Sequence, residues 1–379
     1  MLWQLDLTSA KNVDHFMLGR KYNILNDDWS LSELHALRNS AVEWLDGEAA
    51  LLSRGCCLYH GNLHSQLTQL IGSVPIPPWK KILTFNPLWR RLFRLMYFNV
   101  LPITPRRFFV TYDKTVGLIS DGQFKPISLN GRFRVLRQGL GCDGDFLYFG
   151  EYFNNPTRDP VHIYRFSLQD TTQAMHRVYT FPAGAIRHIH RIQTDPYTGD
   201  LWCMTGDLPK ECQILKTTDA FASLDIIGGG DETWRCISPL FTQKYIYYAT
   251  DSEFRQNAIY RINRGSGRRE FIKAIDGPVY YSKKVGSNLF FAVTAEGCPS
   301  QALPCASIWH VHEDNEDGTG AKKILSFKKD RLSPKLFLPG TITFPSGALP
   351  EESAVYINTF ALSHADFAVF KLSWTEPDR

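Results

Sequence analysis

Two histidines that are one residue apart, His188 and His190, are well suited to proton transfer. They lie in the segment Ile186 to Ile192, which its pattern predicts to be a β-strand. Side chains two residues apart on a strand share one face, so both imidazoles should point the same way. Because histidine titrates near neutral pH and binds metals, the pair could act as a general base, as a proton donor or as two ligands of a divalent metal.

Acidic residues follow four apolar, aromatic runs at intervals of 56, 44 and 45 residues, and these acids are Glu151, Asp207, Asp251 and Glu296. If Asp195 to Gly199 is a tight turn between antiparallel strands, His188 comes close to Asp207. The same construction gives the other acids a basic or hydroxyl partner, with Arg235 near Asp251, Tyr280 near Glu296, and Arg132 or Arg134 near Glu151.

These residues form the candidates for one site. The catalytic candidates are His188, His190, Asp207, Glu151, Asp251 and Tyr280. The substrate-binding candidates are the cations and aromatic rings predicted at the same end of the strands, namely Arg134, Arg187, Arg235, Tyr152, Trp234 and Tyr281. The alternative is structural, because an arginine opposite an aspartate on neighbouring strands is often an ion pair, and repeated acids can cap loops.

The elements that must position these residues are short strands. Each acid-ended run has β-branched and aromatic strands before and after it, so the recurring unit contains four strands. A repeat of about 45 residues with four strands indicates a blade of a β-propeller. We therefore predict an all-β fold over residues 106–379, with about six four-stranded blades, five or seven being alternatives.

Residues 1–105 are expected to form a partly helical extension. The segment from Ser30 to Leu45 has helical spacing, and Ser30 with Glu33 fits a capping box. Residues 79–98 carry five basic residues among Trp, Leu and Phe and contain no acid. Such a basic amphipathic stretch could lie in a membrane interface, or it could pack its apolar side on the propeller.

Composition limits the function classes. The chain has 379 residues, 44% of them hydrophobic, which is enough for a large core, and its net charge of +4 is too small to indicate nucleic-acid binding. It has no pattern of a secretory signal and no apolar run of about 18 residues. Its eight cysteines lack zinc-site spacing. We expect a cytoplasmic protein, with contact to the inner face of the membrane through residues 79–98.

One segment carries a family resemblance. Residues 214–227 resemble a degenerate Asp-box, the hairpin motif of sialidase-like and BNR-repeat propellers, with Thr217 or Thr218 and Asp219 matching and Phe221 standing at the glycine position. Residues 162–173 resemble a weaker copy. The resemblance implies an arginine triad, for which Arg134, Arg187 and Arg235 are available, an aspartate acid/base, and a tyrosine nucleophile such as Tyr280 or Tyr281. The Phe/Tyr-Arg-Ile-Pro motif of sialidases has only residues 133–136 as its nearest match, without the proline.

The histidine pair is similar to that of some propeller polysaccharide lyases, which can be metal-dependent. Both families act on acidic sugars, whose carboxylate needs arginine or a metal, and whose cleavage needs an acid and a base. The expectation is therefore a carbohydrate-active protein of cell-surface glycan metabolism that cleaves, transfers or binds an acidic glycan at the axial end of the propeller. The alternatives are a scaffold for protein partners and a lyase assisted by a metal on His188 and His190.

Overall fold

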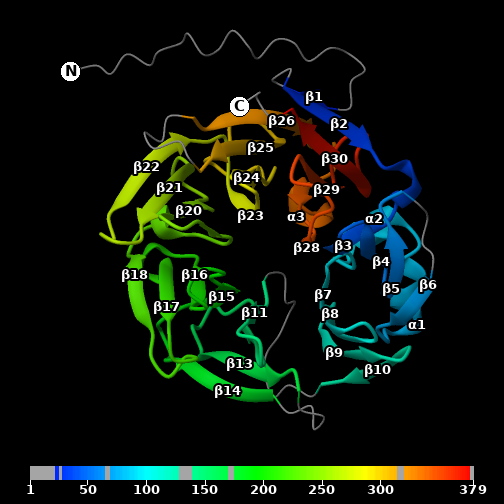
Figure 1. Cartoon of the computed structure of the whole chain (residues 1–379), viewed down its shortest axis with the longest axis horizontal. Helices are drawn as coiled ribbons and strands as arrows, with labels where there is room; N and C mark the ends of the chain where they lie inside the picture. The colour runs from blue at the N-terminus through cyan, green and yellow to red at the C-terminus, as the bar shows by residue number, and fades with distance from the viewer. Residues whose placement is uncertain are drawn as a thin grey trace.

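The computed structural model describes residues 22–24, 28–64, 69–127, 139–169, 175–313 and 320–375. The strands form seven sheets arranged around a central axis (Figure 1). The fold is a seven-bladed β-propeller. The predicted all-β class is confirmed, and the number of blades is seven, one of the alternatives to six.

Each blade has four consecutive positions from the axis outward. Blades 1 to 4 are formed by β3 (Ala41–Asp46), β4 (Ala49–Arg54), β5 (Cys57–Asn62) and β6 (Gln69–Ser73); by β7 (Phe98–Thr104), β8 (Arg107–Tyr112), β9 (Thr115–Ser120) and β10 (Gln123–Pro126); by β11 (Gly141–Cys142), β12 (Phe146–Gly150), β13 (Val161–Ser167) and β14 (Met175–Phe181); and by β15 (His188–Thr194), β16 (Leu201–Gly206), β17 (Gln213–Thr217) and β18 (Asp225–Gly229).

The remaining blades complete the ring. Blades 5 to 7 are formed by β19 (Leu240–Phe241), β20 (Tyr245–Ala249), β21 (Ala258–Asn263) and β22 (Arg269–Ala274); by β23 (Val279–Val285), β24 (Asn288–Val293), β25 (Cys305–His312) and β26 (Lys322–Lys328); and by β27 (Thr341–Thr343), β29 (Ala354–Phe360), β30 (Ala368–Trp374) and β2 (Trp29–Glu33). Two short strands extend blades, since β1 (Asn23–Ile24) pairs with β26 and β28 (Ser346–Ala348) pairs with β3.

Blade 7 closes the ring by joining distant parts of the sequence. Its outermost strand, β2, pairs antiparallel with β30, with Trp29 opposite Trp374. The Trp29 ring also contacts Phe290 of blade 6 at a centroid distance of 5.8 Å. Opening the ring at this point would expose a buried tryptophan, so β2 stabilises the whole circle.

The division expected at residue 105 differs from the structure. Residues 41–73 form blade 1, and β7 begins blade 2 at Phe98, so much of this segment belongs to the ring. The helix predicted from Ser30 is wrong, because Ser30 lies in β2. Val42 and Leu45, whose spacing suggested a helix, are buried in β3 against side chains of blade 7.

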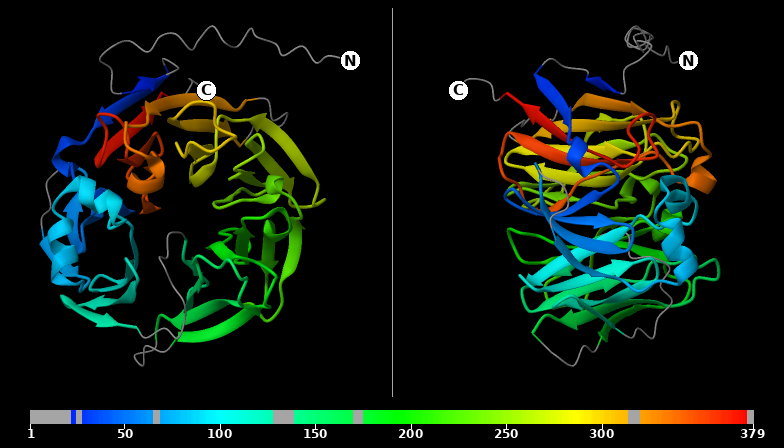
Figure 2. Two further views of the ribbon diagram at one scale, coloured as in Figure 1. Left: turned by 180° about the vertical axis from the view of Figure 1, so that it is seen from behind. Right: turned by 90° about the vertical axis from the view of Figure 1, so that its right-hand side faces the viewer.

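The basic aromatic segment 79–98 forms two short helices, α1 (Pro78–Leu83) and α2 (Pro87–Leu92). The Asn86 side chain caps α2 by accepting a hydrogen bond from the backbone N–H of Leu88 at 2.8 Å. Pro87 can only begin a helix, so the two helices stay separate. A third helix, α3 (Pro334–Phe337), lies near α2 on the same side of the ring (Figure 2). Among the described helices, none has the length and apolar character needed to cross a bilayer.

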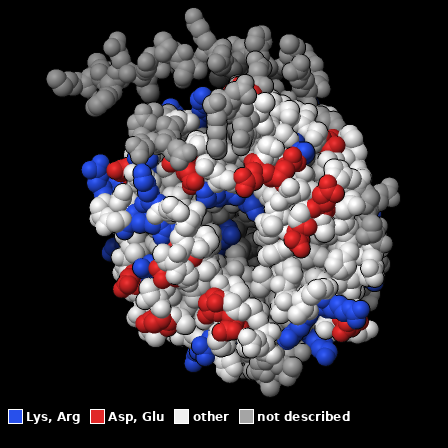
Figure 3. Space-filling view, viewed as in Figure 1, with Lys and Arg blue, Asp and Glu red and all other residues white. Residues whose placement is uncertain are grey.

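The two flat faces of the ring carry different connections. Strands alternate in direction, so the loops between blades and those between second and third strands all lie on one face. This face carries α1, α2, α3 and the short 3-10 helices η2 (His35–Leu37), η3 (Pro209–Glu211) and η4 (Glu232–Trp234). We call it the helix-bearing face, and the other, shown in Figure 3, the opposite face.

Candidate functional site at the propeller axis

The predicted catalytic residues meet at the helix-bearing end of blade 4. His188 begins β15 and lies opposite Gly206 in β16, which places Asp207 beside it. Nε2 of His188 lies 3.5 Å, and Nε2 of His190 3.3 Å, from the same carboxylate oxygen, Oδ1 of Asp207. Arg187 donates to the other oxygen of Asp207 at 2.8 Å. We call this group, together with Arg235 and Asp251, the axial cluster.

Backbone carbonyls orient both imidazoles. Nδ1 of His188 lies 3.2 Å from the carbonyl oxygen of Phe153, and Nδ1 of His190 lies 3.4 Å from that of Cys236. A carbonyl only accepts, so each Nδ1 carries the proton. In the neutral imidazole Nε2 is then a lone pair, and it faces the carboxylate of Asp207. A proton or another cation between Nε2 and the carboxylate is therefore favoured.

Arg235 connects two carboxylates. Its guanidinium lies 3.1 Å from Asp207 and 3.1 Å from Asp251. Burial raises the pKa of Asp251 well above its usual range, although the charge of Arg235 opposes this. Burial also opposes the charge of Asp207, but hydrogen bonds from His188 and His190 outweigh it and hold the pKa of Asp207 far below its usual range.

The two carboxylates therefore differ in protonation, since Asp207 is ionised and Asp251 tends to hold a proton. The pKa of His190 is lowered by burial, with the hydrogen bond to Asp207 acting the other way. The cluster thus combines a proton donor with groups that can accept a proton.

A tyrosine and a glutamate form a pair from the neighbouring blade. The hydroxyl of Tyr280 in β23 donates to Oε1 of Glu296 at 2.7 Å, which is the contact expected from the strand register. Burial and the charges of Glu296 and Asp251 raise the pKa of Tyr280 well above its usual range. The Tyr152 ring lies over His188 at a centroid distance of 4.3 Å and over His190 at 6.5 Å.

The remaining predicted residues lie elsewhere. Glu151 accepts from the backbone N–H of His162 at 2.9 Å and from the Tyr164 hydroxyl at 3.2 Å, so it caps blade 3 from a buried position. Trp234 stacks on Tyr248 at 6.0 Å, under the guanidinium of Arg269, as part of blade packing.

Two further candidates complete this account. Tyr281 follows Tyr280 in β23 and faces the central cavity described below rather than the axial cluster. Arg134, with Arg132, lies outside the described residues.

The donor set of the axial cluster fits a divalent cation in part. His188, His190 and Asp207 offer ligand atoms within 4.8 Å of one another, and the carbonyl bonds to Nδ1 leave both Nε2 atoms available. The two guanidinium groups of Arg187 and Arg235 already occupy the Asp207 carboxylate. A metal would have to displace or tolerate these charges.

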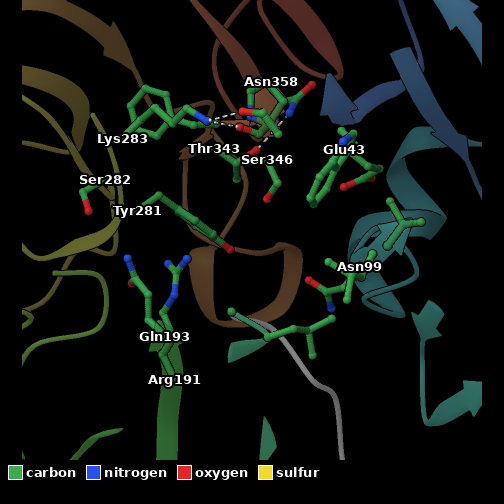
Figure 4. A pocket seen from close by; sticks show the side chains of 18 of the residues that line it. Glu43, Asn99, Arg191, Gln193, Tyr281, Ser282, Lys283, Thr343, Ser346 and Asn358 are labelled. Atoms are coloured by element: carbon green, nitrogen blue, oxygen red, sulfur yellow. Dashed lines mark hydrogen bonds between the residues drawn. The ribbon is translucent and has the colours of Figure 1, made fainter. Parts of the chain in front are cut away.

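A central cavity of about 430 Å³ lies further along the same axis. It is lined by first strands of several blades, and the polar side chains shown in Figure 4 include Glu43, Asn99, Arg191, Gln193, Tyr281, Ser282, Lys283, Thr343 and Asn358. The cavity shares two strands with the axial cluster. β15 supplies His188 and His190 at its start and Arg191 further on, and β23 supplies Tyr280 and then Lys283.

Two cations of this cavity have no carboxylate partner among the described residues. Arg191 donates to the Ser238 hydroxyl at 2.8 Å, while its Nε is buried without a hydrogen-bond partner. Lys283 donates to the backbone carbonyls of Pro345 and Gly347 at 3.0 and 3.3 Å. Oε1 of Gln193, buried nearby, also lacks a partner among the described residues.

The pKa values of the cavity follow from burial. Burial and the nearby charge of Arg191 lower the pKa of Lys283 to about 8. Burial also lowers the pKa of Arg191 to about 10. Across the cavity, burial raises the pKa of Glu43 to about 7 against a hydrogen bond from Ser53. Figure 3 shows the hollow at the centre of the opposite face with Lys and Arg gathered around it.

Sequence reasoning missed this cavity. Arg191 directly follows the histidine pair, but the alternation of a regular strand would turn it away from the face of His190. A shift of register between Ile189 and Arg191 changes this alternation. Lys283 comes from blade 6, and no local pattern in the sequence links it to Arg191.

The turn that resembles an Asp-box joins β17 and β18. Thr217 donates to Oδ1 of Asp219 at 2.7 Å, and the Ser223 hydroxyl donates to Oδ2 at 2.7 Å. Phe221, which stands at the glycine position of the motif, has φ of 72° and is buried against Tyr148. The turn is therefore held by hydrogen bonds around Asp219, with a phenylalanine in the left-handed conformation that favours glycine.

Comparisons with known proteins support the fold. No protein-family model matches the chain, and no curated protein matches its sequence. Among solved structures, the chain is similar to the extracellular domain of a one component system from B. thetaiotaomicron, with 10% identity and a TM-score of 0.53 over 94% of this chain and 40% of that one. It is also similar to the extracellular domain of a hybrid two component system from the same organism, with 11% identity and a TM-score of 0.53 over 90% of this chain and 40% of that one.

The chain thus spans less than half the length of these two structures. At such low identity the likeness concerns the propeller fold alone.

Proposed function

We propose that this protein binds a sugar that carries a carboxylate in its central channel. The observation that supports this most directly is the pair Arg191 and Lys283, which are buried side by side in the cavity without a carboxylate partner among the described residues. Burying a cation without a counter-charge is costly, and an anionic ligand would remove that cost. Arginine can hold a carboxylate with two parallel hydrogen bonds.

The other lining residues favour a sugar over a small inorganic anion. Tyr281 and Trp44 offer aromatic faces on which a sugar ring can stack. Gln193, Asn99 and Asn358 provide amide groups suited to hydroxyls, which donate and accept hydrogen bonds. A cavity of about 430 Å³ is within the usual range for sites of small ligands.

The axial cluster supplies the groups needed for chemistry on such a glycan. Cleavage or transfer at a glycosidic bond requires one carboxyl group that donates a proton and one basic or nucleophilic group. Asp251 and Asp207 have pKa values shifted in opposite directions, and Arg235 holds them together. Tyr280 with Glu296 provides a second pair of the kind that the sialidase resemblance implies. The proposed class is therefore a carbohydrate-active protein of glycan metabolism.

Calorimetry with matched ligands tests the binding step. The ligands are an oligosaccharide that contains a hexuronic acid and the same oligosaccharide after its carboxyl groups have been reduced to alcohols. We expect the acidic form to bind at least about tenfold more tightly. Arg191→Gln and Lys283→Met should each remove this preference, and Arg268→Gln, an exposed arginine on the opposite face, serves as the control.

Equal affinity for the acidic and reduced forms would contradict the proposal. So would an unchanged preference in both cavity variants, provided that their melting temperatures stay near the wild-type value. Turnover is assayed separately with Asp251→Asn, which should retain binding and lose any cleavage or transfer activity.

A further inference from the structure

The helix-bearing face carries most of the exposed apolar side chains of this protein. Among the described residues, fourteen large hydrophobic side chains are exposed, and ten of them lie in loops or helices of this face, namely Trp79, Ile82, Phe85, Leu88, Trp89, Phe93, Leu208, Phe254, Leu303 and Leu336. Of the other four, Tyr197 lies on the opposite face, and Leu70, Ile226 and Phe271 lie on outermost strands. Exposed apolar patches of this kind mark interaction surfaces.

The patch is concentrated on α1, α2 and the residue that follows α2. Phe85 is 81% exposed and Ile82 is 69% exposed. Trp79 and Trp89 contact Phe93 at centroid distances of 6.1 and 6.2 Å, so the rings touch one another and still face solvent. A solvent-facing helix normally shows the reverse pattern, with its apolar side toward the core.

Buried arginines hold α2 in this orientation. Arg90 donates to the backbone carbonyl of Asn39 at 3.2 Å and is buried over the Phe367 ring. Arg91 donates to the backbone carbonyl of Phe337 in α3 at 3.0 Å and pairs with Asp330 and Asp366. The cations of α2 thus anchor the helix to the ring, and its aromatic side is left outward.

Charge separates the two faces as strongly as hydrophobicity does. The sequence has no Asp or Glu between Glu48 and Asp113, and none between Asp330 and Glu351. In the described loops and helices of the helix-bearing face, Glu253 is the one exposed acid, against seven exposed cations, Arg38, Lys81, Lys114, Lys210, Arg255, Arg331 and Lys335.

The described loops and strand ends of the opposite face show the reverse balance. Their exposed cations are Arg106, Lys244 and Arg268, and their exposed acids are Asp28, Glu48, Asp121, Asp143, Asp145, Asp219 and Glu352. The molecule is therefore polarised along the propeller axis.

We propose that the helix-bearing face docks on the surface of an anionic lipid bilayer. Tryptophan and phenylalanine enter the interface between headgroups and acyl chains, and nearby lysines and arginines face the lipid phosphates. Trp79, Phe85 and Trp89 are placed to insert, while Lys81 and Lys335 lie on the same helices and α3. The charge of the face selects an anionic surface over a neutral one.

Docking would turn the axial cluster toward the bilayer, because Asp207 and Asp251 follow second strands and lie on the same face. A lipid-linked acidic glycan would then reach the axis from the membrane. This last step rests on the proposed function, whereas the docking itself does not.

Co-sedimentation with vesicles tests the docking on the full chain. The probes are vesicles of phosphatidylcholine alone and vesicles of phosphatidylcholine with added phosphatidylglycerol. We expect binding to the anionic vesicles, accompanied by a blue shift of tryptophan emission. The triple variant Trp79→Ser, Phe85→Ser, Trp89→Ser should reduce the bound fraction at least about tenfold. The double variant Lys81→Gln, Lys335→Gln should weaken binding by about fivefold for each charge.

A control matches the apolar loss at another place. The double variant Ile226→Ser, Phe271→Ser removes exposed apolar side chains from outermost strands and should bind as the wild type does. The docking proposal is overturned if the wild type binds neither vesicle, or if the control loses as much binding as the triple variant. It is equally overturned if light scattering shows a dimer that the triple variant abolishes while vesicle binding is absent, because the face would then be a protein interface. Calorimetry with soluble glycans remains a separate readout of the channel.

Discussion

At the residue scale, Asp207 organises the axial cluster. One carboxylate oxygen lies within 3.5 Å of Nε2 of His188 and His190 and of Nη2 of Arg235, and the other oxygen accepts from Arg187. No other described carboxylate has so many cationic or proton-bearing partners. The orientation of all four partners therefore depends on a single negative charge.

Removing that charge should destabilise the fold. Asp207→Asn leaves the largely buried guanidinium of Arg235 with Asp251 as its one carboxylate, so we expect the free energy of unfolding to fall by about 3 kcal/mol at pH 7. The control Asp121→Asn affects an exposed pair with Arg106 at 3.9 Å, which should contribute little. Urea unfolding followed by fluorescence measures both variants.

The effect should also depend on pH with a fixed sign. Because the pKa of Asp207 is lowered in the folded state, its stabilisation is present above the unfolded value of 3.8 and is lost as pH falls below it. The difference between the wild type and Asp207→Asn should therefore shrink between pH 5 and about pH 2. A difference that grows toward acid would show that Asp207 is not ionised in the fold.

At the element scale, the strands that end in an acid could be predicted from local sequence. β12, β16, β20 and β24 each end within three residues of the acid that marked them. Their aromatic and β-branched composition favours strands regardless of the rest of the chain. The tight turn at 195–199 also fixed the register that brings His188 to Asp207.

Blade 1 could not be predicted in the same way. Its first two strands are rich in Ala, Glu and Leu, which favour helix locally. Their extended form depends on a distant residue, because the Asn358 side chain in blade 7 accepts from the backbone N–H of Val42 at 2.8 Å and donates to its carbonyl at 3.0 Å. The Arg191 and Lys283 pair was missed for the same reason, since ring closure alone brings blades 4 and 6 to one cavity.

Ring closure by β2 gives a prediction about an element. A chain that starts at Asp28 retains β2, and a chain that starts at Leu34 lacks it. Both lack β1, so their comparison isolates the closing strand. We expect the shorter chain to melt at least about 10 °C lower, because it exposes the edge of β30 and the partners of Trp29. Equal melting temperatures would mean that β2 does not hold the ring closed.

At the scale of the whole molecule, the channel connects two different environments. The axial cluster lies at the basic, apolar helix-bearing end, and the cavity extends toward the hollow of the acidic opposite face. Acidic residues on the outer part of a face and cations at its centre guide an anionic ligand to the axis and disfavour its binding elsewhere. The proposed glycan would therefore contact residues of several blades at once.

The charge of the cavity should make ligand binding depend on pH. Lys283 has its pKa lowered to about 8, so it loses its positive charge as pH rises through that value. Glu43, with its pKa raised to about 7, gains a negative charge over a neighbouring range. Both changes disfavour an anionic ligand, so affinity for the hexuronate oligosaccharide should fall at least about tenfold between pH 6.5 and 9.5. Lys283→Met should bind weakly at every pH and lose most of this dependence, whereas a constant affinity in the wild type would exclude Lys283 from contact with the carboxylate.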